Sequence, residues 1–228
     1  MLIRINRVVD SAIFTVRNNC PFTIWPAALT GAGSPAQTGF ELPPQASRAL
    51  AIPAPWSGRI WARFQCSNSG RFTCESADCN SDQIECNGAG GTPPATLVES
   101  TLAGDQGKDF NDVSLVDGFN LPVAVASAGG NCPPTSCPVD INNKGCPNEL
   151  AVRGGNGGVV GCKSACLALN QPQYCCTGAY SSPATCKPTS YSQIFKSQCP
   201  EAYSYAYDDQ TGLLTCPTGN DYLITFCP

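Results

Sequence analysis

Short stretches in which apolar and polar residues alternate run along most of the chain. Alternation with a period of two is typical of β-strands that bury one face. Gly and Pro residues break the chain between these stretches, and Asp117-Gly118 is a turn signal. The pattern therefore predicts a mainly β protein whose strands include 13–16, 23–25, 60–64, 96–102, 111–116, 121–126, 203–207 and 222–226.

Two cysteine-rich regions interrupt the alternation. The first, at about 65–94, is rich in Gly and Ser and has little periodicity, so it predicts a small stapled lobe. Helical spacing occurs only in the second, where Cys162, Cys166 and Leu169 form one series and 191–198 another, with Ser190 as a candidate N-cap. We expect a central β domain at 11–63, 95–138 and 200–228, a small lobe at 64–94, and a partly helical, disulfide-rich lobe at 139–199.

The chain contains sixteen cysteines and no histidine. Repeated C-x-x-C pairs, the usual mark of zinc sites, are missing from the sequence, so eight disulfides and no metal are expected. The adjacent Cys175 and Cys176 should bond to different partners. Spacing alone does not fix the connectivity, but the cysteine count favours an oxidising compartment and a secreted protein.

The missing imidazole excludes Ser-His-Asp and Cys-His catalysis. Acid and base chemistry would then depend on carboxylates, tyrosines or lysines with shifted pKa values, and carboxylates are the first candidates. No cofactor is expected.

Thirteen basic against seventeen acidic residues give a net charge of -4. This balance argues against nucleic acid or an anionic membrane as a partner, and no apolar run is long enough for a transmembrane segment. Residues 1–10 lack the features of a signal peptide, and we treat them as extraneous or as the remnant of a leader.

Several motifs together resemble one family, the thaumatin-like proteins, which are the plant pathogenesis-related family five. The resemblance covers residues 11–228, includes the full set of cysteines, and looks closest to the acidic fruit members. The motifs are NNCP at 18–21, GRFTCESADC at 70–79, PPATL at 93–97, DVSLVDGFN at 112–120, YCC at 174–176 and YLITFCP at 222–228.

The resemblance implies a flattened antiparallel β-sandwich flanked by a disulfide-rich lobe and a small loop lobe, and a monomer. It also implies a specific disulfide pairing: Cys20-Cys227, Cys66-Cys74, Cys79-Cys86, Cys132-Cys216, Cys137-Cys199, Cys146-Cys162, Cys166-Cys175 and Cys176-Cys186.

Antifungal members of this family carry an acidic cleft that binds fungal cell-wall β-1,3-glucan and in some members hydrolyses it weakly. By resemblance, the matching residues here are Arg59, Glu99, Asp112, Asp117 and Asp208. A one-residue shift would exchange Asp208 for Asp209. We take Glu99 as the candidate acid and Asp112 or Asp117 as the candidate base, so the chain is at most a weak endo-β-1,3-glucanase.

Each of these residues also has an ordinary structural interpretation. Arg59 and Glu99 fit exposed strand positions, Asp117 fits a turn, and Asp112 fits a strand end. The alternative function is a protein inhibitor of a microbial enzyme such as a xylanase, without catalysis. The acidic balance argues against the sweet taste of the strongly basic relatives.

Aromatic residues near the acids have two interpretations. The three tyrosines at 203, 205 and 207 share one face of the expected strand and favour core packing over a sugar-stacking platform. Phe110 or Phe119 is then the candidate for an aromatic rim to the cleft.

Three residues depart from the family pattern. Asp82 stands where glycine is usual and could disturb a turn, and Ser76 replaces a threonine. Ser100 replaces a large apolar residue beside Glu99, which predicts looser packing there.

Overall fold

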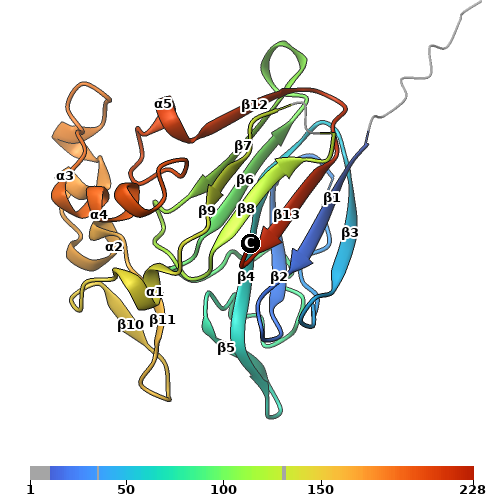
Figure 1. The fold of residues 1–228 in the computed structure, drawn as a ribbon, viewed down its shortest axis with the longest axis horizontal. Coiled ribbons are helices and arrows are strands. Elements are labelled where there is room, and N and C mark those ends of the chain that lie inside the picture. The colour runs from blue at the N-terminus through green and yellow to red at the C-terminus, as the bar shows by residue number, and fades with distance from the viewer. Residues whose placement is uncertain (1–10, 35, 130–131) are drawn as a thin grey trace, which may run out of the picture.

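The computed structural model describes residues 11–34, 36–129 and 132–228, so the expected leader remnant at 1–10 lies outside the described residues. Two β-sheets pack face to face, and a lobe of short helices lies at one side of them (Figure 1). One sheet has the strand order β3-β1-β13-β8-β9 and the other β12-β7-β6-β4-β2. The predicted mainly β, thaumatin-like sandwich with a partly helical lobe is confirmed.

The elements have the following bounds. The strands are β1 (Ser11–Asn18), β2 (Trp25–Ala32), β3 (Ser47–Pro53), β4 (Trp56–Asn68), β5 (Phe72–Ser76), β6 (Leu97–Leu102), β7 (Lys108–Ser114), β8 (Val123–Ser127), β9 (Thr135–Cys137), β10 (Ala151–Arg153), β11 (Val159–Cys162), β12 (Leu213–Pro217) and β13 (Tyr222–Phe226). The helices are η1 (Asp105–Gly107), α1 (Ile141–Lys144), α2 (Ala165–Leu169), α3 (Pro172–Cys175), η2 (Gly178–Tyr180), α4 (Ser190–Gln198) and α5 (Asp209–Gly212).

The main core lies between the two sheets. Alternate residues of β1 and β13, among them Phe14, Val16 and Ile224, are buried completely. They meet Ile60 and Val113 from the opposite sheet in one cluster. Period-two alternation produces this arrangement because successive strand side chains point to opposite faces.

The two ends of the described chain pair with each other. Strands β1 and β13 run parallel, with Phe14 opposite Tyr222 and Asn18 opposite Phe226, whereas the other named strand pairs are antiparallel. The Cys20–Cys227 disulfide lies directly after this pair. Both terminal strands are thereby held in one sheet.

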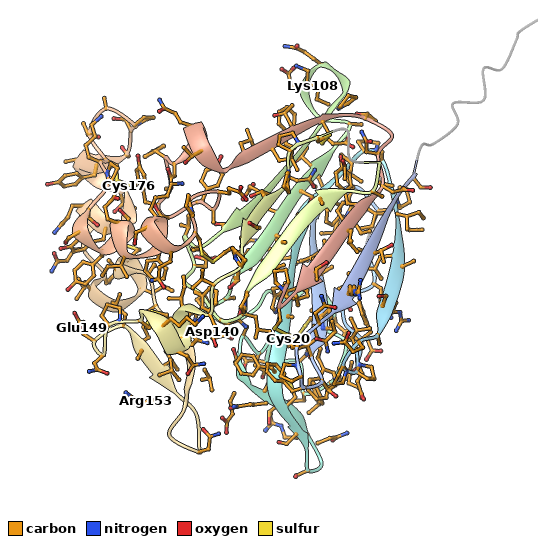
Figure 2. The ribbon with its side chains drawn as sticks, viewed as in Figure 1. Cys20, Lys108, Asp140, Glu149, Arg153 and Cys176 are labelled. Carbon is orange, nitrogen blue, oxygen red and sulfur yellow. A yellow bond between two sulfur atoms is a disulfide. The ribbon has the colours of Figure 1, made fainter. Side chains whose placement is uncertain are left out.

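Eight disulfides crosslink the described residues, and they are the eight pairs that the family resemblance implies. The adjacent Cys175 and Cys176 bond to Cys166 and Cys186 and so join neighbouring turns of the helical lobe. Figure 2 shows Cys176 inside this lobe, far from Cys20 at the end of the β1 strand. The lobes, which have few strand pairs, hold much of the crosslinking.

A second, smaller core covers part of the outer face of the sheet that contains β2, β4, β6, β7 and β12. Strand β4 is thirteen residues long and continues past the sandwich to pair with β5. Trp61 on β4 is fully buried against the loop after β5, where its Nε1 donates to the Ala77 carbonyl. The small lobe therefore covers one half of this sheet face and leaves the other half open.

The strand predicted at 203–207 is wrong. Only Tyr203 makes a strand-like bridge, to Ser114, and the three tyrosines are half-buried rather than packed in the core. The reason is local: the Asp208 carboxylate accepts hydrogen bonds from the backbone and hydroxyl of Ser204, which turns the chain back on itself. The alternation of Tyr with small residues at 203–207 gives no sign that a side chain, and not a neighbouring strand, accepts the hydrogen bond of the Ser204 amide.

Two further sequence predictions need correction. Segment 23–25 contributes only Trp25 to a strand, since β2 begins there. Cys162 ends β11 and does not belong to the helix that contains Cys166 and Leu169, because α2 begins only after the Ser164 cap.

The N-cap of α4 is Thr189, not Ser190. The Thr189 hydroxyl accepts from the Ser192 amide, and the Ser192 hydroxyl accepts from the Thr189 amide at 2.8 Å. This reciprocal capping box satisfies two backbone donors at the start of the helix. Two adjacent residues with hydroxyl side chains made the boundary ambiguous in the sequence.

The unusual Asp82 is accommodated rather than disruptive. It adopts a left-handed conformation with φ of 60°, and its carboxylate accepts two hydrogen bonds from Arg71 at 2.7 and 2.8 Å. Its carbonyl accepts from the Phe72 amide. Asp is among the residues that tolerate this region, so Asp can replace glycine in this turn.

Replacing Thr189 tests the capping assignment. We expect Thr189→Ala to lower the free energy of unfolding by about 1 kcal/mol, because the Ser192 amide loses its acceptor. Ser190→Ala is the matched control and should change it by less than about 0.5 kcal/mol, since Ser190 is exposed. Chemical denaturation of the two variants measures the difference; an equal loss in both would refute the Thr189 cap.

Candidate functional site

A row of five side-chain positions crosses the open half of the outer face of the sheet with the strand order β12-β7-β6-β4-β2. Strand pairing places Leu29 opposite Arg59, Arg59 opposite Glu99, Glu99 opposite Asp112, and Asp112 opposite Leu213. Directly opposed residues on one face have Cβ atoms about 4.5–5.5 Å apart. Three of the five residues implied by the resemblance are thus direct neighbours on three adjacent strands.

This row forms the floor of a groove. Two depressions, of about 440 and 400 Å³, share Arg59, Glu99 and Asp112 in their walls. The first is extended by Leu29, Phe110 and Leu213, and the second by Asp117, Tyr203 and Ala206. The groove therefore has a more apolar end, an acidic centre and an end that carries a phenol.

Of the two phenylalanines that the sequence offered as an aromatic rim to the cleft, one lies in the groove and one does not. Phe110 lines the groove, whereas Phe119 is fully buried in the main core, and the proposal that it borders the acids is wrong. Tyr203 is the aromatic residue that sequence reasoning assigned to the core. Its position follows from the turn at 204–208, which no periodicity signals.

Arg59 and Asp117 form an ion pair across the groove. Their side chains approach to 3.7 Å and are 41% and 39% exposed. Pairs with this exposure contribute little to stability because water screens them. The pair leaves Arg59 accessible to a ligand and places its positive charge beside Glu99.

Burial and crowding change the protonation of the central acids. The pKa of Asp112 is raised to about 8, first by burial and then by the negative charges of Glu99 and Asp209. The pKa of Glu99 is raised by burial and by Asp117, but Arg59 opposes this shift. At neutral pH Asp112 therefore holds a proton, whereas Arg59 favours ionised Glu99.

Asp208 and Asp209 occupy different surroundings. The side chain of Asp208 is 13% exposed, pairs with Lys196 at 2.9 Å, and accepts from Ser204. Neither Asp208 nor Asp209 is among the groove-lining residues. Asp209 is exposed and accepts a hydrogen bond from the Tyr203 hydroxyl at 2.9 Å.

The polar Ser100 does not loosen the site. Ser100 points away from Glu99 into the core, is 4% exposed, and its hydroxyl donates to the side-chain amide oxygen (Oδ1) of Asn111 at 2.6 Å. Ser100 and Asn111 are directly opposed, one position along from Glu99 and Asp112. This buried hydrogen bond joins β6 and β7 directly behind the acids.

Neither a metal cluster nor a membrane helix is found in the described part of the chain. Residues 11–34, 36–129 and 132–228 contain no group of three or more potential Cys, Asp or Glu ligands. None of the helices described in these ranges is long and apolar enough to cross a membrane.

Comparisons with known proteins identify the family of this chain. The thaumatin family model matches residues 18–228. Thaumatin-like protein 1 of Pyrus pyrifolia is 60% identical, over 96% of this chain and 92% of the relative. A Prunus avium protein named glucan endo-1,3-beta-glucosidase is 52% identical, over 96% of this chain and 91% of the relative.

A solved structure gives the same fold at low identity. The thaumatin-like xylanase inhibitor TLXI aligns with a TM-score of 0.52 and 21% identity, covering 94% of this chain and 99% of the inhibitor. At this identity the likeness concerns the fold.

The pH dependence of stability tests the protonation of Asp112. Folding raises its pKa from 3.8 to about 8, so the unfolded chain releases this proton first as the pH rises. Asp112 therefore lowers the free energy of unfolding progressively between about pH 4 and 8, and Asn at this position does not. We expect Asp112→Asn to gain in Tm relative to the wild type over this interval.

Thermal denaturation across the same pH range measures this gain. Asp105→Asn, at an exposed acid outside the groove, is the control and should differ from the wild type by a constant amount. A constant difference for Asp112→Asn as well would show that Asp112 ionises normally.

Proposed function

The chain belongs to the thaumatin family, and we propose that it is a secreted defence protein that binds β-1,3-glucan of fungal cell walls in the acidic groove. The proposal depends above all on the in-register row of Arg59, Glu99 and Asp112 on the groove floor. These groups offer both donors and acceptors to sugar hydroxyls. The Prunus avium relative, whose name states glucanase activity, supports the same substrate class.

The shape of the groove suits an extended polysaccharide. Its two depressions join end to end along the sheet, and Phe110 and Tyr203 lie in opposite parts of it. Aromatic rings present flat apolar surface to sugar rings, and the acidic groups between them can form hydrogen bonds with the sugar hydroxyls. A neutral glucan also suits a protein with a net charge of -4, because no charge repulsion opposes its approach.

Weak endo-β-1,3-glucanase activity is the second part of the proposal. Hydrolysis needs one carboxyl group that donates a proton to the glycosidic oxygen and one carboxylate that activates water or attacks the anomeric carbon. We assign the donor role to Asp112, which is protonated at neutral pH, and the second role to Glu99, with Asp117 beside it. This assignment reverses the order expected from sequence.

The chemistry of this assignment balances without a cofactor. The proton of Asp112 passes to the leaving oxygen as the bond between that oxygen and the anomeric carbon breaks. If Glu99 activates water, it takes one proton from that water, the remaining hydroxyl bonds to the anomeric carbon, and the proton returns from Glu99 to Asp112 through solvent. If Glu99 attacks, it first forms an ester bond to the anomeric carbon; water then breaks this bond, gives its hydroxyl to the carbon and its proton to Asp112, and frees the Glu99 carboxylate. Arg59 stabilises the negative charge of Glu99 during the step.

Co-sedimentation with insoluble β-1,3-glucan tests binding, and reducing-sugar release tests hydrolysis. We expect Glu99→Gln and Asp112→Asn each to reduce binding at least about tenfold, because a charge-assisted or strongly polarised hydrogen bond is lost. Sugar release should fall to background in both variants. Glu149→Gln, at an exposed acid on the helical lobe (Figure 2), is the control and should behave as the wild type.

The outcome also distinguishes the alternative function. Binding that is unchanged in Glu99→Gln and Asp112→Asn contradicts a role for the groove. A wild-type protein that binds no glucan but inhibits a microbial xylanase would instead be an inhibitor, as the name of the structural neighbour TLXI describes that protein. Binding without any sugar release would leave a glucan-binding protein that is not an enzyme.

A further inference from the structure

Two consecutive acids, Asp208 and Asp209, follow the tyrosine-rich segment, and their side chains make different contacts. The Asp208 carboxylate accepts from the Ser204 amide, the Ser204 hydroxyl and Lys196, each at 2.9 Å. All three contacts are made by Oδ2, and Oδ1 accepts from the Thr211 hydroxyl at 3.3 Å. Both oxygens of Asp208 therefore bind groups of the turn, of α5 or of α4, which identifies Asp208 as a loop-shaping residue.

Tyr203 connects this loop to the groove. Its amide donates to the Val113 carbonyl and its carbonyl accepts from the Leu115 amide, so its backbone is fixed to the end of β7. The ring packs against Gly212, where a side-chain carbon would collide with it. The position of the phenol in the groove wall is thus defined by the strand on one side and α5 on the other.

The Tyr203 hydroxyl donates to Asp209 at 2.9 Å. Asp209 also lies near enough to Asp112 for its charge to affect that residue. Asp209 itself is exposed at the first turn of α5, behind the groove-lining Tyr203 to which it is hydrogen-bonded. One exposed carboxylate therefore acts on both the aromatic wall and the acidic floor.

We propose that Asp209, and not Asp208, is the positioning acid of this groove, orienting the Tyr203 phenol and placing a negative charge beside Asp112. The inference rests on the proposed glucan-binding function for its biological meaning, but its physical content concerns only these three residues. The family resemblance selects Asp208 as the fifth residue of the site, and the proposal replaces it with Asp209.

The charged groups around Asp112 explain why Asp209 matters. Glu99 on β6 is directly opposite Asp112, and Arg59 lies beyond Glu99 on β4. Asp117 lies in the turn after β7 and lines the same depression. Arg59 pairs with Asp117, so these two charges largely offset each other near the groove. Burial, Glu99 and Asp209 then raise the pKa of Asp112 together.

Tyr203 takes part as a neutral donor. Burial, the hydrogen bond to Asp209 and the surrounding acids raise the pKa of its phenol. The hydroxyl therefore keeps its proton and donates a hydrogen bond to Asp209. The lone pairs of its oxygen remain available to accept a hydrogen bond from a sugar hydroxyl. Loss of Asp209 would free this hydroxyl to rotate.

The test is a carboxyl-carbon NMR titration of protein labelled at aspartate, comparing Asp209→Asn with Asp208→Asn. For Asp209→Asn we expect the midpoint of Asp112 to move to lower pH by on the order of 0.5–1 pH unit, because a nearby negative charge is lost. Asp208→Asn should leave this midpoint in place and lower the Tm, because the largely buried Lys196 loses its charged partner.

Tyr203→Phe provides a second, independent variant. Tyr203→Phe keeps the aromatic ring and removes the hydroxyl donor. We expect Tyr203→Phe and Asp209→Asn to weaken glucan retention by similar factors. An unmoved Asp112 midpoint in Asp209→Asn, or an equal shift in Asp208→Asn, would overturn the proposal. The titration needs no sugar, so a wild type that fails to bind glucan refutes the proposed function alone.

Discussion

The register between β4, β6 and β7 is the constraint on which the groove depends. Arg59, Glu99 and Asp112 meet only because three strands pair with these residues directly opposite one another. A slip of one residue would move each of them to the core face. The register is specified from behind by apolar neighbours, Val98 against Val113, and by the buried hydrogen bond between Ser100 and Asn111. The same pairing that buries the core therefore assembles the site.

The second constraint is the small lobe, which decides how much of the sheet face stays open. Arg63 is fully buried on β4 and donates to the Trp25 carbonyl, the Cys79 sulfur and the Ile84 carbonyl. Burial lowers its pKa to about 10, with partial compensation from Asp78 and Glu85, so it remains charged at neutral pH. Three hydrogen bonds to one buried cation fix a lobe that has few strand pairs of its own. The lobe in turn covers Trp61 and leaves Arg59, two residues earlier on the same strand face, at the edge of the groove.

Much of the fold could be predicted from the sequence, because period-two alternation reports directly which strand face is buried. It succeeded at 13–16 and 222–226, where Phe14 and Ile224 are buried, and it failed at 203–207, where the Asp208 carboxylate accepts a hydrogen bond from the backbone of Ser204. The disulfide pairs and the candidate site residues came from family resemblance, since spacing alone left the connectivity open. Which of Asp208 and Asp209 acts on the groove could not be predicted, because adjacent residues of one type differ only in the hydrogen bonds that the folded loop offers them.

The protonation of the acids is a further property that no sequence pattern carries, and it relates function to stability. A carboxyl group whose pKa is raised by burial and like charge opposes folding wherever the unfolded chain would ionise it. The groove concentrates such groups on one sheet face, with Glu99 and Asp112 directly opposed. Their destabilising effect is compatible with a rigid fold because the strands beneath them are tied by a buried core and the segments around them by disulfides. Among the crosslinks, the Cys132–Cys216 disulfide anchors β12, the strand that pairs with β7 beside Asp112, so at this edge a covalent bond supports the strand that borders the acids.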